Sequence, residues 1–297
     1  MKHYIISVLA FVVGMVMVSG VAAELRIVTT IPDFGAIAKE IGKDKVSVTS
    51  LVRPTQDPHF VDAKPSFAVS LHRADALLLS GMELESGWLP PLMRNARNRR
   101  IQNGGAGYID CSRFIDAKDI RAVDRAQGDI HPGGNPHYWT DPQNGIRIAN
   151  GILAALNELA PESAAFFTAN TSAFVKRLKQ KMTQWRGTLN KQGPVNVVVY
   201  HESWTYFLEW AGYRQKGTLE PKPGVPPSPA HIVKLIQNVK RDNVRYVLQE
   251  SFYPTNLSRL FAQKTGAQLK VLPTMVGAQG TTSYIDLIDT IVKEITQ

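Results

Sequence analysis

Cysteine is almost absent from this sequence, since its 297 residues include only Cys111. A single cysteine cannot form a disulfide within the chain, so we expect an ordinary hydrophobic core with Cys111 as a small buried residue. Beyond residue 23, no apolar run is long enough to cross a membrane. Internal repeats and low-complexity tracts are also lacking, which argues against a repeat protein or a disordered one.

The first 23 residues have the features of a secretory signal. Lys2 precedes an uncharged run from Tyr4 to Val18, and small residues occupy positions 21 and 23. We therefore expect cleavage before Glu24 and export to the periplasm. The alternative is a membrane anchor, which would need about 20 apolar residues. No cysteine lies near the cleavage point, so a lipid anchor is not expected.

The net charge of +9 comes from basic residues that are dispersed except between Arg94 and Arg100. This cluster could meet phosphate or an acidic partner surface, but such runs are more often a solvated surface or a helix end. No nucleic-acid-binding motif accompanies it, so we expect no nucleic-acid partner.

Short apolar runs alternate with helical patterns along the chain. Expected strands are residues 25–30, 45–52, 74–81 and 107–112 in the first half, and 195–201, 244–250 and 268–273 in the second. This alternation is typical of β-α units around parallel sheets. The sequence therefore predicts an α/β protein of two lobes, each with its own parallel sheet.

Residues 161–190 connect the two halves, begin with proline and contain no glycine before Gly187. A helix of about 27 residues would be ~40 Å long, the length of a whole domain. We expect one long rigid helix, with a break near Thr171 as the alternative. The predicted organisation is a signal at 1–23, an N-terminal lobe at 24–160, this linking helix, and a C-terminal lobe at 191–297.

Three histidines occupy comparable places in this scheme. His59 follows the second expected strand, His137 lies in a loop of the first half, and His201 follows the strand at 195–201 directly. Because ligands of open α/β sheets bind beyond the carboxyl ends of the strands, these side chains are expected to meet in a cleft between the lobes. A proline precedes both His59 and His137, and it restricts the backbone before an ion binds.

These segments resemble those of a known family. An Asp-Pro-His at 57–59, a Pro-His-x-Trp-x-Asp-Pro at 136–142, the Ser-Trp-Thr-Tyr-Phe after His201, and the long helix stand in the order found in metal-binding solute receptors of ABC transporters, the periplasmic zinc and manganese binding proteins. The resemblance covers essentially the whole mature chain. It implies a divalent metal clamped between two lobes and delivered to an inner-membrane permease, and we expect a monomer without catalytic residues.

Carried over by position, His59, His137 and His201 match the family's first three metal ligands. Manganese-type members usually have a carboxylate at the third position, so His201 favours Zn²⁺ over Mn²⁺, because imidazole suits zinc and hard oxygen ligands suit manganese. Copper and nickel would also bind such a site, since intrinsic affinity does not separate these metals.

The fourth ligand is where this sequence departs from the family. Many members place an aspartate in the loop after the last strand, whereas residues 271–280 here contain no carboxylate, and Asp286 falls in the expected terminal helix. We take Glu250 as the substitute, with His131 or water as alternatives. Glu250 could instead accept a hydrogen bond from a ligand imidazole.

Other polar and aromatic residues near these motifs have structural interpretations. Asp141 is expected to cap the helix that begins near Pro142, with orientation of His137 as the alternative. For Tyr138, Trp139 and Trp204 we favour a place in the core over the cleft wall. The proline-rich residues 220–229 are expected to form an ordered extended loop.

Two other functions are compatible with three histidine ligands. Three histidines with an open fourth position also suit a catalytic zinc in an exported hydrolase, with Glu202 or Glu250 as base. The absence of His-Glu-x-x-His and His-x-His argues against that enzyme. A metal-binding adhesin or buffering protein on the same fold would bind zinc without a permease.

Overall fold

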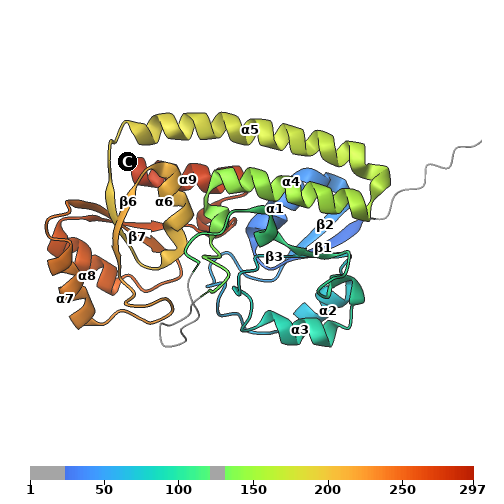
Figure 1. The fold of residues 1–297 in the computed structure, drawn as a ribbon, viewed down its shortest axis with the longest axis horizontal. Coiled ribbons are helices and arrows are strands. Elements are labelled where there is room, and N and C mark those ends of the chain that lie inside the picture. The colour runs from blue at the N-terminus through green and yellow to red at the C-terminus, as the bar shows by residue number, and fades with distance from the viewer. Residues whose placement is uncertain (1–23, 121–130) are drawn as a thin grey trace, which may run out of the picture.

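The computed structural model describes residues 24–120 and 131–297 and has two α/β lobes beneath one long helix (Figure 1). Each lobe contains a four-stranded sheet whose neighbouring strands are all parallel. The expected α/β class and two-lobe arrangement are therefore confirmed. In the part of the chain that is described, no helix has the length and hydrophobicity to cross a membrane. The predicted signal at 1–23 lies outside the described residues.

The N-terminal sheet has the strand order β2-β1-β3-β4. Its strands are β1 (Leu25–Thr29), β2 (Val46–Ser50), β3 (Ala76–Leu79) and β4 (Tyr108–Asp110), and its helices are α1 (Pro32–Gly42), α2 (Pro65–Arg73) and α3 (Leu89–Ala96). Every residue of β3 is buried, which fits its uninterrupted apolar sequence. Proline begins both α1 and α2, where its fixed φ suits the first helical turn.

The C-terminal sheet has the strand order β6-β5-β7-β8. Its strands are β5 (Asn196–Val199), β6 (Arg214–Thr218), β7 (Val244–Glu250) and β8 (Gln268–Leu272), and its helices are α6 (Thr205–Ala211), α7 (Pro229–Asn238) and α8 (Asn256–Thr265). Strand β6 was not predicted from the sequence, because its Arg-Gln-Lys-Gly-Thr segment has no apolar residue. An edge strand exposed on one side can be this polar, because it does not have to fill a core.

Two consecutive helices connect the lobes, α4 (Pro142–Leu159) and α5 (Ala164–Asn190). Helix α5 is continuous over 27 residues, with no break at Thr171, and spans both lobes (Figure 1). A short 3-10 turn at Pro161–Ser163 precedes it. The expected single linking helix is thus present.

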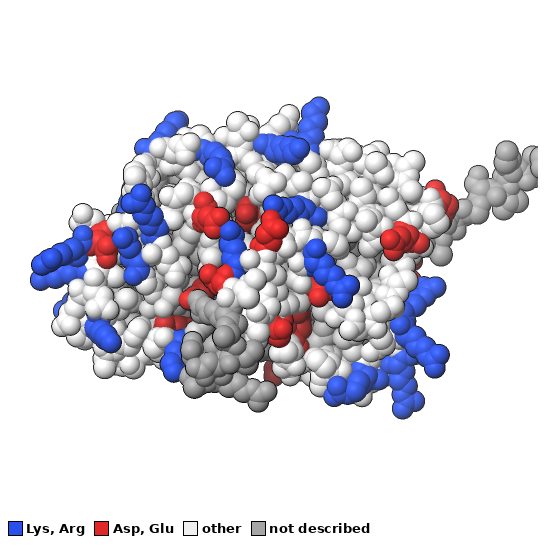
Figure 2. Space-filling model, in the orientation of Figure 1, with Lys and Arg blue, Asp and Glu red and all other residues white. Residues whose placement is uncertain are grey.

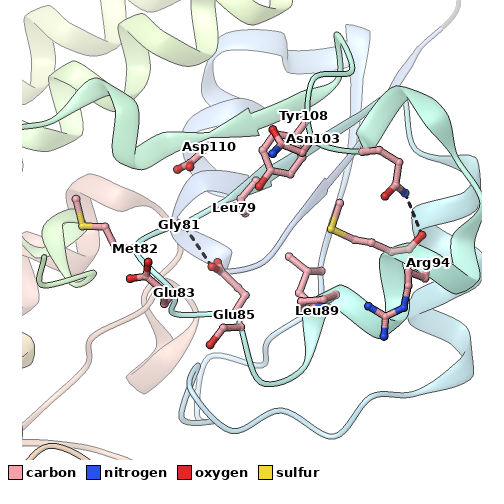
Figure 3. A pocket seen from close by; sticks show the side chains of 14 residues that line it. Leu79, Gly81, Met82, Glu83, Glu85, Leu89, Arg94, Asn103, Tyr108 and Asp110 are labelled. Atoms are coloured by element: carbon pink, nitrogen blue, oxygen red, sulfur yellow. Dashed lines mark hydrogen bonds between the residues drawn. The ribbon is translucent and has the colours of Figure 1, made fainter. Parts of the chain in front are cut away.

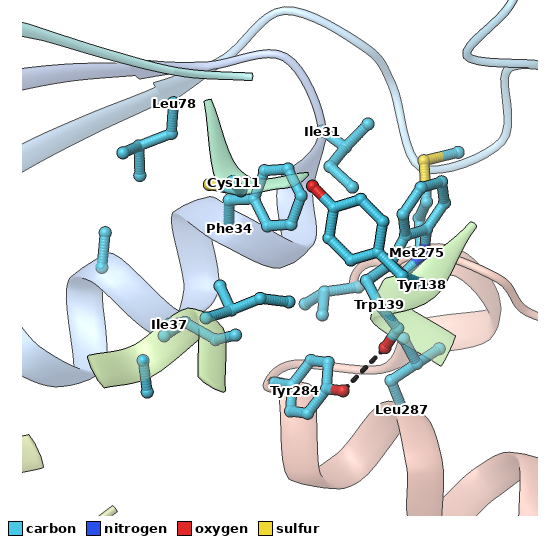
Figure 4. Packing of buried hydrophobic residues seen from close by; sticks show 14 of the residues in the cluster. Ile31, Phe34, Ile37, Leu78, Cys111, Tyr138, Trp139, Met275, Tyr284 and Leu287 are labelled. Atoms are coloured by element: carbon cyan, nitrogen blue, oxygen red, sulfur yellow. Dashed lines mark hydrogen bonds between the residues drawn. The ribbon is translucent and has the colours of Figure 1, made fainter. Parts of the chain in front are cut away.

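The last helix, α9 (Tyr284–Thr296), returns to the middle of the molecule and packs against α5 and α1. The hydroxyl of Tyr284 donates to the carbonyl oxygens of Trp139, at 2.6 Å, and Asp141 (Figure 4). Aromatic and aliphatic side chains of both lobes thereby form one continuous core, which includes Phe34, Tyr138 and Leu287. The end of the chain therefore ties the lobes together alongside α5.

Loops of the two lobes also touch directly. The indole N–H of Trp139 donates to the carbonyl oxygen of Thr274 at 2.8 Å. Gly277 has a φ of 98°, and a Cβ there would lie 2.5 Å from Cγ of Pro54. Only glycine accepts both that conformation and that close approach.

Candidate metal centre

The structure brings His59, His137 and His201 together at the junction of the two lobes. His59 follows β2 and His137 precedes α4, both in the N-terminal lobe, whereas His201 follows β5 of the C-terminal lobe. One ring nitrogen from each lies within 4.8 Å of the other two, and all three residues are buried. The expected convergence of three imidazoles between the lobes is therefore present in the geometry.

Two side chains fix the orientation of these imidazoles, Asp57 two residues before His59 and Asn135 two residues before His137. Oδ1 of Asp57 accepts from the backbone N–H of His59 at 3.0 Å and lies 2.7 Å from its Nδ1. Oδ1 of Asn135 makes the same two contacts with His137, both at 3.0 Å. The restricting effect of the intervening prolines was predicted from the sequence, but this acceptor role was not. The shared Asp/Asn-Pro-His pattern could have indicated it.

The third imidazole has an equivalent partner from a distant segment. Nδ1 of His201 lies 2.7 Å from Oε2 of Glu220, which is itself buried. The same oxygen accepts from the backbone N–H of Gly224 at 3.1 Å. Residues 220–229 therefore form an ordered loop, as expected, and their first residue supports a candidate metal ligand.

These contacts determine which nitrogen of each ring faces the centre. Because each Nδ1 donates its proton to an oxygen, each Nε2 keeps its lone pair for a metal ion. Nε2 of His59 is buried and has no hydrogen-bond partner among the described residues. The arrangement is that of ligands oriented before an ion arrives, which lowers the ordering cost of binding.

The electrostatics differ among the imidazoles. Burial, reinforced by the neighbouring rings of His59 and His201, holds the pKa of His137 well below its ordinary value. Burial also disfavours charge on His201, but the hydrogen bond and negative charge of Glu220 outweigh it and raise the pKa of His201. His137 is therefore neutral at pH 7, as a metal ligand has to be, whereas His201 competes for a proton.

The candidates for a fourth ligand lie beside the three histidines. Glu250 ends β7 and is fully buried, and burial raises its pKa to about 7 against the opposing effects of His201 and Ser203. Within the described ranges, neither of its oxygens makes a hydrogen bond of ordinary geometry, and it is not part of the three-nitrogen cluster. The ring centroid of His131 lies 5.3 Å from that of His59.

Asp286 has a different task, at the start of α9. Its Oδ2 accepts from the backbone N–H of Thr282 at 2.7 Å, and its own N–H donates to the hydroxyl of Ser283. These are the reciprocal contacts of a helix N-terminus. As expected, Asp286 does not join the histidines.

The nearby motif residues have the structural roles that the sequence analysis favoured. Asp141 caps α4, since its Oδ1 accepts from the N–H of Gln143 at 2.7 Å. Tyr138, Trp139 and Trp204 are all at most 1% exposed and belong to the core. Cys111 is also buried.

A cavity of about 440 Å³ lies in the N-terminal lobe, beside the turn that follows β3 (Figure 3). Its lining includes Met82, Leu89 and Tyr108 together with the carboxyl of Glu85, but no histidine. Both Glu85 oxygens accept backbone N–H groups, from Ser80 and Gly81. The carboxyl therefore holds the turn after β3.

The basic cluster at Arg94–Arg100 begins in the last turn of α3, and its four arginines are exposed. In Figure 2, basic side chains gather at the outer end of the N-terminal lobe, remote from the junction. The four arginines therefore lie at an exposed helix end, as expected.

Comparison with known proteins gives the same two-lobe receptor architecture. The family described as zinc-uptake complex component A, periplasmic, matches residues 27–297. The manganese-binding lipoprotein MntA of Halalkalibacterium halodurans is 25% identical over 284 residues, covering 92% of this chain and 89% of that protein. The high-affinity zinc uptake system protein ZnuA of Bacillus subtilis is 22% identical over 259 residues, covering 86% and 79%.

A crystal structure of ZnuA superposes with a TM-score of 0.77 at 26% sequence identity, covering 92% of this chain and 98% of the other. Membership of a family of solute-binding receptors for divalent metals, rather than enzymes, excludes the hydrolase alternative. Because the family match extends over both lobes and the linking helix, the chain belongs to the zinc-uptake complex component A family of periplasmic solute-binding proteins.

Proposed function

We propose that this protein captures Zn²⁺ with His59, His137 and His201 and delivers it to an ABC transporter permease in the inner membrane. The observation that carries the proposal is the convergence of three buried imidazoles whose ring nitrogens lie within 4.8 Å of one another. Ligands from both lobes would let the bound ion hold the lobes in one relative position. A permease could then recognise that position.

Zinc is favoured over manganese by the donor set. The centre offers three imidazole nitrogens, and Mn²⁺ prefers carboxylate and carbonyl oxygens. Relatives of this chain include a manganese-binding protein and a zinc uptake protein, so similarity alone does not select the metal. The choice of metal therefore rests on the ligand atoms of this chain. Zinc in a structural or transport site takes four ligands in a tetrahedron.

Glu250 is our proposed fourth ligand. Its carboxyl is buried beside His201, and neither oxygen makes a hydrogen bond of ordinary geometry to the described part of the chain. The carboxyl lies outside the three-nitrogen cluster, so its side chain would have to move to join a bound ion. His131 and water are the alternatives that mutation has to distinguish.

The proposed setting follows from export. Cleavage before Glu24 would release a periplasmic monomer with an N-terminal lobe at 24–160, the linking helix at 161–190 and a C-terminal lobe at 191–297. The proposed partners are the metal ion and the permease, with no nucleic acid.

Metal selectivity and delivery test this function together. Metal-stripped protein (residues 24–297) should take up one Zn²⁺ per chain by calorimetric titration and bind Mn²⁺ at least about a hundredfold more weakly, as a site with three imidazole ligands predicts. A strain that lacks the gene should require added zinc in chelator-containing medium, and the wild-type gene, but not His137→Ala, should restore growth. Restoration by His137→Ala, or tighter binding of Mn²⁺ than of Zn²⁺, would contradict the proposal.

A further inference from the structure

We infer that Asp57 and Asn135 are positioning residues that couple the orientation of two ligand imidazoles to the docking of the C-terminal lobe. Each uses one side-chain atom to hold an imidazole of its own lobe and another to bond the opposite lobe. The inference rests on the proposed metal site and adds to it a physical route by which metal binding changes the contact between the lobes.

Asp57 forms the first of these bridges. Its Oδ1 holds His59, and its Oδ2 accepts from the hydroxyl of Tyr253 at 3.1 Å, across 196 residues of sequence. Tyr253 follows β7 in the C-terminal lobe and stacks on Tyr200, with ring centroids 4.3 Å apart. Tyr200 immediately precedes His201, so this bridge runs from one ligand imidazole to the residue beside another.

Asn135 forms the second bridge. Its Oδ1 holds His137, while its Nδ2 donates to the carbonyl oxygen of Glu202 at 2.8 Å and to Oγ1 of Thr205 at 3.2 Å. Glu202 is the residue that follows His201. A third bond supports the same point, since the hydroxyl of Tyr206 donates to the backbone oxygen of Asn135 at 2.8 Å.

The identity of residue 135 fits this double role. A carboxylate can only accept hydrogen bonds, whereas an amide accepts through Oδ1 and donates through Nδ2. At position 57 the cross-lobe partner is a hydroxyl donor, and a carboxylate is suitable. At position 135 the cross-lobe partners include a carbonyl acceptor, and an amide is required.

Coupling follows from the geometry. An ion on His59 and His137 fixes the rings against Asp57 and Asn135, and it thereby holds the second atoms of these side chains toward the C-terminal lobe. Separation of the lobes would break these hydrogen bonds, which costs free energy. By linkage, whatever metal binding adds to lobe docking, lobe docking adds to metal affinity.

Tyr253→Phe tests the first bridge, because it removes only the hydroxyl and leaves the contact between Asp57 and His59. We expect zinc to bind at least about tenfold more weakly, the loss of about one hydrogen bond to a charged group. The visible spectrum of bound Co²⁺ should not change, because the ligands are the same. Tyr213→Phe is the matched control, since the Tyr213 hydroxyl bonds Gln192 far from the centre.

Asn135→Asp tests the second bridge. The carboxylate would still accept from His137 and would make that imidazole a more basic ligand, which by itself strengthens metal binding. Nδ2 of Asn135 also lies 3.3 Å from Oδ2 of Asp119 in its own lobe, so the new carboxylate would be repelled there as well. Weaker zinc binding that persists in Asn135→Asp combined with Asp119→Asn is therefore assigned to the lost cross-lobe donor. Wild-type protein should also show slower amide hydrogen exchange in residues 201–206 and 251–255 when zinc is added, and both variants should lose most of that protection.

Two results together would overturn the inference: Tyr253→Phe binds zinc within twofold of wild type, and Asn135→Asp binds zinc as tightly as wild type or more tightly. It would also be overturned if zinc protected both variants from hydrogen exchange as strongly as it protects the wild type. Those results would leave the metal site itself intact. Failure of the wild type to bind one zinc would instead contradict the proposed function, so the two failures are distinguishable.

Discussion

Glu220 and His201 are 19 residues apart in sequence, yet Oε2 of the first lies 2.7 Å from Nδ1 of the second, and both are buried. The contact links a proline-rich loop to a candidate metal ligand. It fixes the tautomer of His201 and raises the pKa of that imidazole against the effect of burial. A carboxylate placed in this way also makes the opposite nitrogen a stronger donor to a metal ion.

Removal of this carboxylate should weaken zinc binding. We expect Glu220→Ala to lower affinity by about 10- to 100-fold, the usual effect of losing a partner that orients a metal-bound histidine. Glu220→Gln should lose less, because its amide oxygen can still accept from Nδ1. Chelator competition measures both, with the exposed Glu158→Gln on α4 as the control. Equal affinity in Glu220→Ala and wild type would contradict the orienting role.

Zinc affinity should depend on pH through His201. Because Glu220 raises the pKa of His201, a proton occupies its Nε2 at a higher pH than in an ordinary histidine, whereas the lowered pKa of His137 keeps that ligand neutral. Affinity should therefore fall as pH drops through the raised pKa of His201, by about tenfold per unit below it. Competition titrations between about pH 7.5 and pH 5.5 measure this dependence. A flat profile would exclude histidine ligation.

In Glu220→Gln the same profile should shift toward lower pH. Loss of the negative charge leaves burial to dominate, and burial lowers the pKa of His201. The variant would then bind more weakly than wild type at high pH but lose less affinity on acidification. Parallel pH profiles for the two proteins would show that Glu220 does not control the titration.

Fold stability should depend on the buried carboxyl of Glu85. Burial raises the pKa of Glu85 to about 7, although the Thr30 side chain and the backbone N–H groups of Ser80 and Gly81 oppose the shift. A carboxyl whose pKa is higher in the folded state contributes stability below its unfolded pKa, and this contribution is lost as pH rises through about 7. Between pH 4.5 and pH 8 the loss is about 3 kcal/mol.

Urea unfolding of the metal-free protein across that pH range tests this prediction. Glu85→Gln has no proton to release, so the difference in unfolding free energy between wild type and variant isolates the Glu85 contribution. The wild type should lose stability relative to Glu85→Gln as pH rises. A difference that stays constant with pH would mean that folding does not raise the pKa of Glu85.

Two helical glycines should respond in opposite directions to alanine. A Cβ at Gly145, in the first turns of α4, would lie 2.4 Å from Cε1 of the buried Tyr284, whereas a Cβ at Gly187 in α5 would meet nothing within 4 Å. Gly145→Ala should therefore cost about 1–3 kcal/mol of unfolding free energy. Gly187→Ala should gain up to about 1 kcal/mol, because alanine favours the helix. Thermal denaturation of both variants measures these effects, and similar effects would contradict the close packing of Tyr284 against Gly145.

Much of the fold could be predicted from local patterns, because strands such as β3 and β5 are short apolar runs and helices such as α4 begin with proline. Strand β6 could not, since an exposed edge strand carries no hydrophobic pattern. The return of α9 to the N-terminal half was also invisible. The apolar pattern of α9 predicts that one face of the helix is buried, but it does not predict which part of the molecule covers that face.

The three histidines could be predicted because their positions at the ends of strands and in stiff loops are local features. The residues that accept hydrogen bonds from these histidines are of two kinds. Asp57 and Asn135 lie two residues from their histidines, and the repeated motif contained the information. Glu220 reaches His201 only because β5 and β6 are neighbours in the sheet, which the sequence analysis had missed.

Zinc binding to metal-stripped protein, measured by competition with a chromophoric chelator, tests the central claim most directly. The account predicts one tight site per chain, lost in His59→Ala, His137→Ala and His201→Ala but retained in His231→Ala, whose ring instead contacts the backbone oxygen of Thr218. Of Glu250→Ala and His131→Ala, the variant that both weakens the site and changes the visible spectrum of bound Co²⁺ identifies the fourth ligand, and water occupies that position if neither does. Wild-type affinity in the three single histidine variants would contradict the account, and the cleft would then have to serve another solute.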